Sequence, residues 1–176
     1  MTPSTAARLV GSLLATVPDF PQPGILFRDL TPVFADARGF AAVIEELVGP
    51  YAGRFDAIAG VDARGFLLAG AAAYHAGVGV LAIRKGGKLP GEVLTETYEL
   101  EYGSAALELH PQQLARDSRV LIVDDVLATG GTIAASARLV QRAGYRVAGI
   151  STVLELRELD GRRRLGDHPV HVIHAV

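Results

Sequence analysis

The sequence predicts an α/β protein with a twisted, mostly parallel sheet flanked by helices. Short apolar runs alternate with longer helical segments, glycine marks the boundaries, and polar residues follow the apolar runs directly. A chain of 176 residues, 49% of them hydrophobic, is long enough to bury one substantial core. With no linker-like stretch or internal repeat, we expect residues 1–176 to form a single domain.

The predicted elements of the first half are bounded by proline, glycine or a capping residue. In order they are a surface helix within residues 1–17, a loop at 18–24, a helix at 37–48, a strand at 56–61, a turn at 62–65, a helix at 66–76 and a strand at 78–83. Three prolines prevent regular structure in the loop. Asp36 is suited to cap the second helix, and Gly77 to end the third.

The second half continues the alternation after an inserted polar segment. Its predicted elements are a loop at 84–94, an antiparallel pair at 95–102 and 105–109, a strand at 119–123, a loop at 124–131, a helix at 132–143 and strands at 146–154 and 170–173. The antiparallel pair alternates polar and apolar residues. Ligands of open α/β sheets bind beyond the carboxyl ends of the strands, so we expect the chemistry at 62–65, 84–94 and 124–131.

Composition excludes several classes of protein. The chain has no cysteine, which rules out disulfides and zinc–thiolate sites. Its 17 Lys+Arg against 19 Asp+Glu give a net charge of −2, which disfavours a basic nucleic-acid-binding protein. No long charge-free apolar run predicts a membrane span, and the first residues lack signal-peptide features. We therefore expect a cytoplasmic protein without nucleic-acid or membrane partners.

Residues 120–132, VLIVDDVLATGGT, carry the strongest functional signal. A buried strand runs into two carboxylates, then a small-residue turn, then a helix. Unsatisfied N–H groups and the dipole at the helix N-terminus favour an anion, and glycine lets the backbone close around a phosphate. Asp124 and Asp125 suit a vicinal diol. For an acidic pair and two glycines alone, a simple helix cap is an equally good explanation.

This thirteen-residue string resembles the phosphoribosyl-pyrophosphate (PRPP) signature of the type I phosphoribosyltransferases. Residues 18–32, 62–66, 84–92 and 98–103 further resemble the adenine-specific members, in the expected order. The resemblance implies a Rossmann-like type I phosphoribosyltransferase fold with a flexible antiparallel lid hairpin. It also implies a base-binding N-terminal segment (1–34), a flexible catalytic loop (84–103) and a cis peptide bond between Asp62 and Ala63.

The same resemblance implies a role for each candidate site residue. The ribose hydroxyls would be bound by Asp124 and Asp125, the 5′-phosphate by Ala128, Thr129, Gly130, Gly131 and Thr132, the pyrophosphate by Arg64, Arg84 and Lys88, and adenine by Phe27, Arg28, Val126 and Leu127. Glu101 would assist proton movement at the base and Tyr102 would help the loop close, with Arg64 and Lys88 completing the catalytic set. Lys85 is a weaker candidate than Lys88.

Several of these residues also have an ordinary structural interpretation. Phe27 alone is more often a core residue, and the 62–65 turn is by itself more often a surface turn with a solvated Arg64. The two lysines of the chain, Lys85 and Lys88, could be a solvated loop tip. Glu99 and Glu101 lie two apart on one strand face, where at least one carboxylate would be solvated. The five histidines match no metal spacing, and the arginines at 162–164 read as a solvated turn.

The implied reaction joins adenine and PRPP to give AMP and pyrophosphate. Mg²⁺ would arrive with the pyrophosphate and have few or no direct protein ligands. The resemblance also implies a homodimer. Two alternatives stay open: a phosphoribosyltransferase for another base, and a non-catalytic nucleotide-sensing regulator on the same fold. A pyrophosphate-release assay with a panel of bases separates them.

Overall fold

The computed structural model describes residues 2–99 and 104–176. The helices are α1 (Thr5–Leu13), α2 (Thr31–Ala35), α3 (Ala37–Val48), α4 (Arg64–Ala76) and α5 (Gly131–Arg142), with short 3₁₀ segments η1 (Gly49–Tyr51), η2 (Arg157–Leu159) and η3 (Gly161–Leu165). The strands are β1 (Ala15–Pro18), β2 (Leu26–Asp29), β3 (Ala57–Val61), β4 (Gly79–Lys85), β5 (Leu94–Glu99), β6 (Ser104–Leu109), β7 (Arg119–Leu127), β8 (Arg146–Glu155) and β9 (Val170–Ala175).

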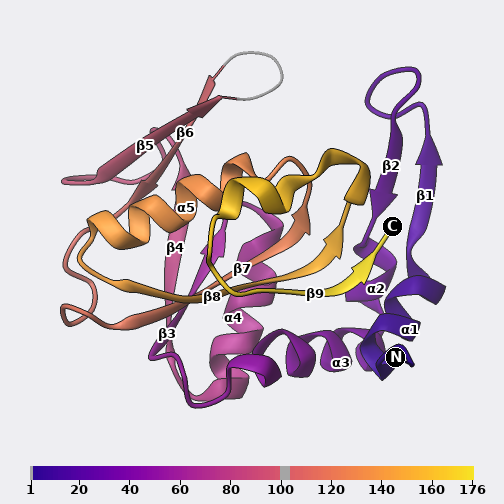
Figure 1. Cartoon of the computed structure of the whole chain (residues 1–176), viewed down its shortest axis with the longest axis horizontal. Helices are drawn as coiled ribbons and strands as arrows, with labels where there is room; N and C mark the ends of the chain where they lie inside the picture. The colour runs from indigo at the N-terminus through magenta and orange to yellow at the C-terminus, as the bar shows by residue number, and fades with distance from the viewer. Residues whose placement is uncertain (1, 100–103) are drawn as a thin grey trace.

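A central seven-stranded sheet with the order β5-β6-β4-β3-β7-β8-β9 organises the molecule (Figure 1). The strands from β4 to β9 in this order pair in parallel, whereas β6 pairs antiparallel with both β4 and β5. Strands β1 and β2 form a separate antiparallel hairpin. The predicted α/β class is confirmed, and so is the predicted antiparallel pair, which is formed by β5 and β6.

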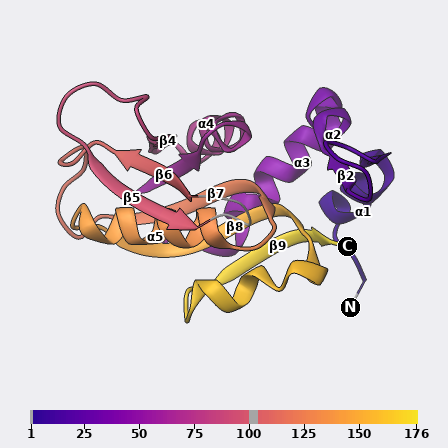
Figure 2. The ribbon, with the colours of Figure 1, turned by 90° about the horizontal axis from the view of Figure 1, so that it is seen from above.

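Helices cover both faces of the sheet, as parallel strands require (Figure 2). Helices α3 and α4 pack on one face, together with α1, and α5 packs on the other. Two apolar cores result, one on each side of the sheet. Within the described residues, no helix is both long enough and apolar enough to cross a membrane.

Local signals set several helix boundaries as predicted. The Asp36 side chain accepts a hydrogen bond from the Gly39 amide at 2.6 Å, so it caps α3. Gly77 adopts the left-handed conformation (φ +67°) that ends α4. Helix α4 begins two residues earlier than predicted, at Arg64. The predicted loop at 18–24 connects β1 to β2, except that Pro18 is still the last residue of β1.

Two predicted boundaries were wrong in ways that matter for the site. Strand β7 continues to Leu127, because residues 126 and 127 still pair with β8, so Asp124 and Asp125 lie on a strand rather than in a loop. Strand β4 likewise extends to Lys85, where it pairs with β6. The N-terminal helix stops at Leu13, and the residues that follow form β1 against β2.

Candidate active site

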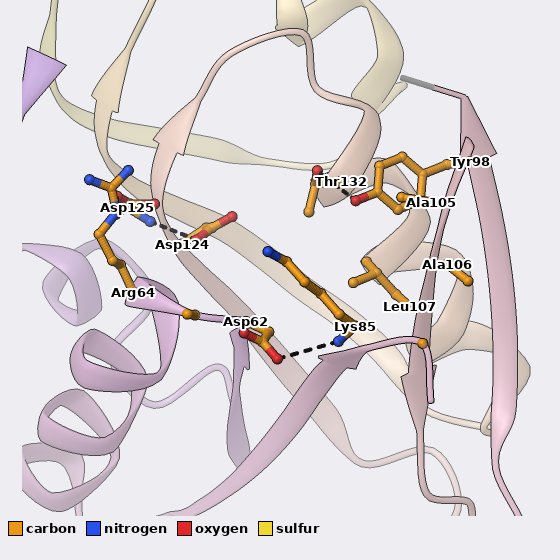
Figure 3. Close-up of a pocket in the computed structure, with 12 residues that line it drawn as sticks. Asp62, Arg64, Lys85, Tyr98, Ala105, Ala106, Leu107, Asp124, Asp125 and Thr132 are labelled. Atoms are coloured by element: carbon orange, nitrogen blue, oxygen red, sulfur yellow. Dashed lines mark hydrogen bonds and ion pairs between the residues drawn. The ribbon is translucent and has the colours of Figure 1, made fainter. Parts of the chain in front are cut away.

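A cavity of about 900 Å³ opens at the carboxyl ends of β3, β4 and β7, next to the β5–β6 hairpin. Figure 3 shows the side chains around it. The lining residues are Asp62, Ala63, Arg64, Lys85, Gly86, Tyr98, Ala105, Ala106, Leu107, Asp124, Asp125 and Thr132. This is the edge of the sheet at which ligands of open α/β folds bind. The three segments predicted to carry chemistry all contribute to this cavity or to the smaller one beside it.

The adjacent carboxylates of β7 occupy different environments. Asp124 faces the cavity, and its Oδ1 accepts a hydrogen bond from the Asp125 amide at 2.9 Å. Burial, and secondarily the negative charge of Asp125, raise the pKa of Asp124 well above its ordinary value. Asp125 is buried and forms an ion pair with Arg64 at 2.6 Å. The pair therefore presents Asp124 to a ligand while Asp125 is held by a counter-charge.

Arg64 connects the acidic pair to the N-terminal segment. Its guanidinium carbon lies 5.9 Å from the centre of the Phe27 ring, within range of a cation–π contact. Phe27 on β2 in turn packs edge-to-face with Phe20, with ring centres 5.2 Å apart. Arg28, in contrast, donates from Nη1 to the Thr16 hydroxyl at 2.8 Å, across the β1–β2 hairpin. Phe27 is thus connected to the acidic pair through Arg64.

A second, smaller cavity of about 70 Å³ adjoins the first at the start of α5. It is lined by Asp124, Val126, Ala128, Thr129, Gly130, Gly131, Thr132 and Ile133. Gly130 takes the left-handed conformation (φ +79°) that turns the chain from β7 into the helix. The Thr132 hydroxyl donates to the Tyr98 hydroxyl at 3.3 Å. The cavity has the size and the helix N-terminus expected of a phosphate cradle.

The short segment η3 packs directly against the backbone of this cavity. Gly161 in η3 packs so closely that a Cβ there would overlap the Ala128 carbonyl oxygen and lie 2.9 Å from the Gly130 nitrogen. Arg162 is anchored beside it by two bonds to the buried Glu155, at 2.7 and 3.1 Å. Residues 162–164 are exposed as predicted, but Arg162 also pairs with Glu155, the last residue of β8.

The loops after β3 and β4 form the opposite wall of the main cavity. The peptide bond between Asp62 and Ala63 is cis, as the family resemblance implied. Asp62 accepts from the Lys85 amide at 3.4 Å, and the Lys85 side chain points into the cavity toward Asp124 (Figure 3). Arg84 donates from Nη1 to the Lys88 carbonyl oxygen at 3.0 Å. This arrangement orders the basic loop next to the acidic pair.

The structure brings together most, but not all, of the predicted site residues. Arg64, Asp124, Asp125 and the whole 128–132 loop line one of the two cavities. Val126 borders the cradle, but Leu127 is fully buried in the core. Lys88 is exposed and lines neither cavity, whereas Lys85 lines the larger one. Two predicted catalytic residues, Glu101 and Tyr102, lie outside the described residues.

Two polar residues that line the cavity, Asp62 and Tyr98, were not among the predicted site residues. Asp62 directly follows the apolar strand β3, a signal that was available in the sequence. Tyr98 lies on the inward face of β5, which also follows from the alternation of that strand. Lys85 could be ranked above Lys88 only once β4 was known to extend to it. Among the residues that the structure describes, no cluster of three metal-ligating side chains is present.

Comparison with known proteins agrees with this geometry. A family model for the phosphoribosyl transferase domain matches residues 29–173. An adenine phosphoribosyltransferase of Clavibacter sepedonicus is 69% identical over 170 residues, which cover 97% of this chain and 88% of the relative.

Two solved structures of adenine phosphoribosyltransferases have the same fold. The enzyme of Thermoanaerobacter pseudethanolicus superposes with a TM-score of 0.92 at 46% identity, over 97% of this chain and 99% of that one. The Saccharomyces cerevisiae enzyme, complexed with adenine and an imino-altritol bisphosphate, gives 0.90 at 37% identity, over 96% and 98% of the two chains. The chain therefore belongs to the phosphoribosyl transferase family and, within it, to the adenine phosphoribosyltransferases.

Proposed function

We propose that this site transfers the 5-phosphoribosyl group of PRPP to adenine, giving AMP and pyrophosphate. The observation that carries the proposal is the place of Asp124, which borders both the small phosphate cradle and the large cavity that contains Lys85. A ribose between a 5′-phosphate and a 1-pyrophosphate needs this order of groups: anion site, diol acceptor, anion site.

The 5′-phosphate would occupy the cradle at the N-terminus of α5. Backbone N–H groups of residues 128–132 and the hydroxyls of Thr129 and Thr132 supply donors, and the helix dipole favours the negative charge. The ribose hydroxyls would donate to Asp124 and Asp125. A diol hydrogen-bonded to these carboxylates stabilises their charged form, which offsets the burial that raises the pKa of Asp124 in the free protein.

The pyrophosphate would lie against the loops after β3 and β4. Lys85 and Arg64 line the cavity and would supply positive charge there, and Arg84 and Lys88, which do not line it, complete the predicted set. The carboxylates of Asp62 and Asp124 line the same cavity and would repel a bare pyrophosphate. The cavity therefore fits a pyrophosphate that carries its own Mg²⁺, held chiefly by pyrophosphate oxygens, and the ion would neutralise charge on the leaving group.

The reaction would proceed by displacement at the anomeric carbon. The bond between ribose C1 and the pyrophosphate oxygen breaks, the electron pair leaves with pyrophosphate, and C1 gains cationic character. N9 of adenine forms the new bond from the opposite face, and the proton of the base is released to a general base. The protein contributes alignment of the two reactants and stabilisation of the departing charge.

Adenine would stack near Phe27, with Val126 on the cradle side. Arg64 links Phe27 to Asp125, so base and ribose sites are joined through one side chain. Glu101 is the proposed group at the base that manages the departing proton, and Tyr102 would help exclude water. Arg28 would contribute backbone groups, because its side chain bonds Thr16.

We also propose that the active form is a homodimer associated through α4 and β4. Three large apolar side chains are unusually exposed there: Leu67 at 60%, Tyr74 at 92% and Val80 at 54%. Helix α4 and strand β4 pack against each other, so these residues lie on neighbouring elements. Such an exposed apolar surface is typical of an interface. Tyr74→Glu should convert the dimer to a monomer in sedimentation experiments; a wild-type monomer would contradict this.

A pyrophosphate-release assay tests the proposed function. Purified protein with PRPP and Mg²⁺ should release pyrophosphate on addition of adenine, and much more slowly with hypoxanthine, guanine or xanthine. Faster release with a 6-oxopurine would assign a different base. The absence of release with every base would favour the regulator hypothesis.

A further inference from the structure

The β5–β6 hairpin is fastened to helix α5 by a cluster of ions that the mechanism above does not use. Glu96 on β5 accepts from Arg138 Nε at 2.5 Å and from Arg142 Nη1 at 2.8 Å. The same Arg142 nitrogen donates to the Thr95 carbonyl oxygen at 2.6 Å. We call this cluster the hairpin clamp.

The clamp is more than a chance surface contact. The Glu96 side chain is only 17% exposed, and its hydrogen bond to Arg138, together with that to Arg142, lowers its pKa against the opposing effect of burial. Arg138 and Arg142 are one helical turn apart, so a single carboxylate receives both. Charge-assisted bonds to a partly buried carboxylate are stronger than a typical exposed ion pair.

The strand that carries the clamp also runs toward the active site. Side chains of β5 alternate, so Glu96 and Tyr98 face α5 together. Glu96 is held near the C-terminal end of α5, whereas Tyr98 receives the Thr132 hydroxyl bond at its N-terminal end. The Glu99 carbonyl oxygen lies near Gly131, 3.6 Å from where a Cβ of that glycine would be. Strand β5 thus ends over the first turn of α5, beside the phosphate cradle.

We propose that Glu96 is a positioning residue which, through Arg138 and Arg142, fixes the hairpin on the helix that carries the phosphate cradle. Glu101 follows Glu99 by two residues in the sequence, so the clamp holds the strand from which the chain continues to this residue. This inference rests on the proposed function for its catalytic consequence, but not for its structural one.

Kinetics test the catalytic consequence. Glu96→Ala should lower kcat by about threefold to tenfold, the range expected when a partly buried ion pair is lost, with little change in the Kd of PRPP. Glu96→Gln, which keeps one acceptor oxygen, should fall between wild type and alanine. The control is Asp117→Asn, which removes an exposed ion pair of 3.1 Å with Arg146 that includes no residue of the hairpin or of α5. It should leave kcat unchanged.

A double-mutant cycle separates positioning from general destabilisation. If Glu96 acts by placing Glu101, Glu96→Ala should add nothing to the loss of kcat already caused by Glu101→Gln. If the two substitutions lowered kcat independently, so that their factors multiplied in the double variant, the proposal would be overturned. A Glu96→Ala variant with the same kcat as the Asp117→Asn control would also overturn it.

A fluorescence reporter tests the clamp even if the protein forms no AMP. The chain contains no tryptophan, so Tyr98→Trp introduces a single probe at the contact between hairpin and helix. Adding Glu96→Ala to this variant should increase quenching of the tryptophan by iodide, whereas adding Asp117→Asn should not. Equal quenching in all three proteins would overturn the clamp. Increased quenching without any AMP formation would instead leave the clamp standing and reject the proposed function.

Discussion

Gly161→Ala should damage the phosphate cradle without altering any residue that contacts substrate. The added Cβ would overlap the Ala128 carbonyl oxygen, approach the Gly130 nitrogen to 2.9 Å and reach Leu127 Cδ1 at 3.0 Å. Two of these contacts are with backbone atoms of the cradle, which cannot rotate away. Either η3 or the 128–130 segment must therefore move.

The structure sets the expected magnitude of both effects. Overpacking of this kind costs about 1–3 kcal/mol of folding free energy. For a chain of this size, that corresponds to a fall in Tm of about 2–12 °C. Because misplacement by about 1 Å can cost about 10²-fold in an active site, we expect the KM for PRPP to rise by about tenfold to 10²-fold.

Thermal unfolding and initial rates at varied PRPP provide the assay. The control is Gly144→Ala, which strains a left-handed glycine (φ +83°) whose Cβ would meet only Arg116 Cγ at 3.8 Å. That strain costs about 1–2 kcal/mol, so the control loses comparable stability. Its KM should stay at the wild-type value. A Gly161→Ala variant that is destabilised but has an unchanged KM for PRPP would refute the bracing role of η3.

Three further outcomes are expected. Glu101→Gln should lower kcat by about 10²-fold or more in steady-state assays, and an unchanged kcat would remove Glu101 from the catalytic set. Asp124→Asn should weaken PRPP binding in calorimetry and yet raise Tm above pH 5. Folding raises the pKa of this carboxyl, so its ionisation destabilises the protein increasingly as pH rises past the pKa of the unfolded state. Equal affinity, or a lower Tm, would count against this. The pKa of Asp56 is lowered to about 2 by Arg119, so its charge stabilises the fold above pH about 4 and this effect is lost as pH falls toward 2. Asp56→Asn should therefore show a reduced dependence of Tm on pH across this window. An unaltered dependence would contradict the assignment.

The parts of the fold that the sequence predicted depend on local chemistry. Asp36 caps a helix through a bond three residues away, and Gly77 ends one by its own backbone conformation. The turn from β7 into α5 was also predictable, because residues 120–132 contain strand, turn and helix start in one continuous string. In these cases the interacting groups are neighbours in the sequence.

The features that escaped prediction depend on contacts between distant segments. Strand β7 extends to Leu127 only because β8 continues to pair with it. The closeness of Gly161 to the cradle joins segments more than thirty residues apart. The ion pair of Glu96 was not predicted, because its partner Arg138 lies 42 positions away on α5. No periodicity or spacing within either segment reveals such a pair.

The family resemblance predicted features that local chemistry does not, and the structure agrees with one of them and differs from another. It located the cis bond after Asp62, which no propensity predicts. It also favoured Lys88, whereas the cavity is lined by Lys85. Resemblance thus located the loop correctly, and the geometry identified the lysine side chain that faces the cavity.

The central claim is that the cavity beside Asp124 joins adenine to PRPP. The most direct measurement is to incubate the wild-type protein with adenine, PRPP and Mg²⁺ and to quantify AMP and pyrophosphate by chromatography. We expect AMP and pyrophosphate in equal amounts, and regeneration of adenine when AMP and excess pyrophosphate are supplied instead. Pyrophosphate released without AMP, or no product from adenine, would contradict the account.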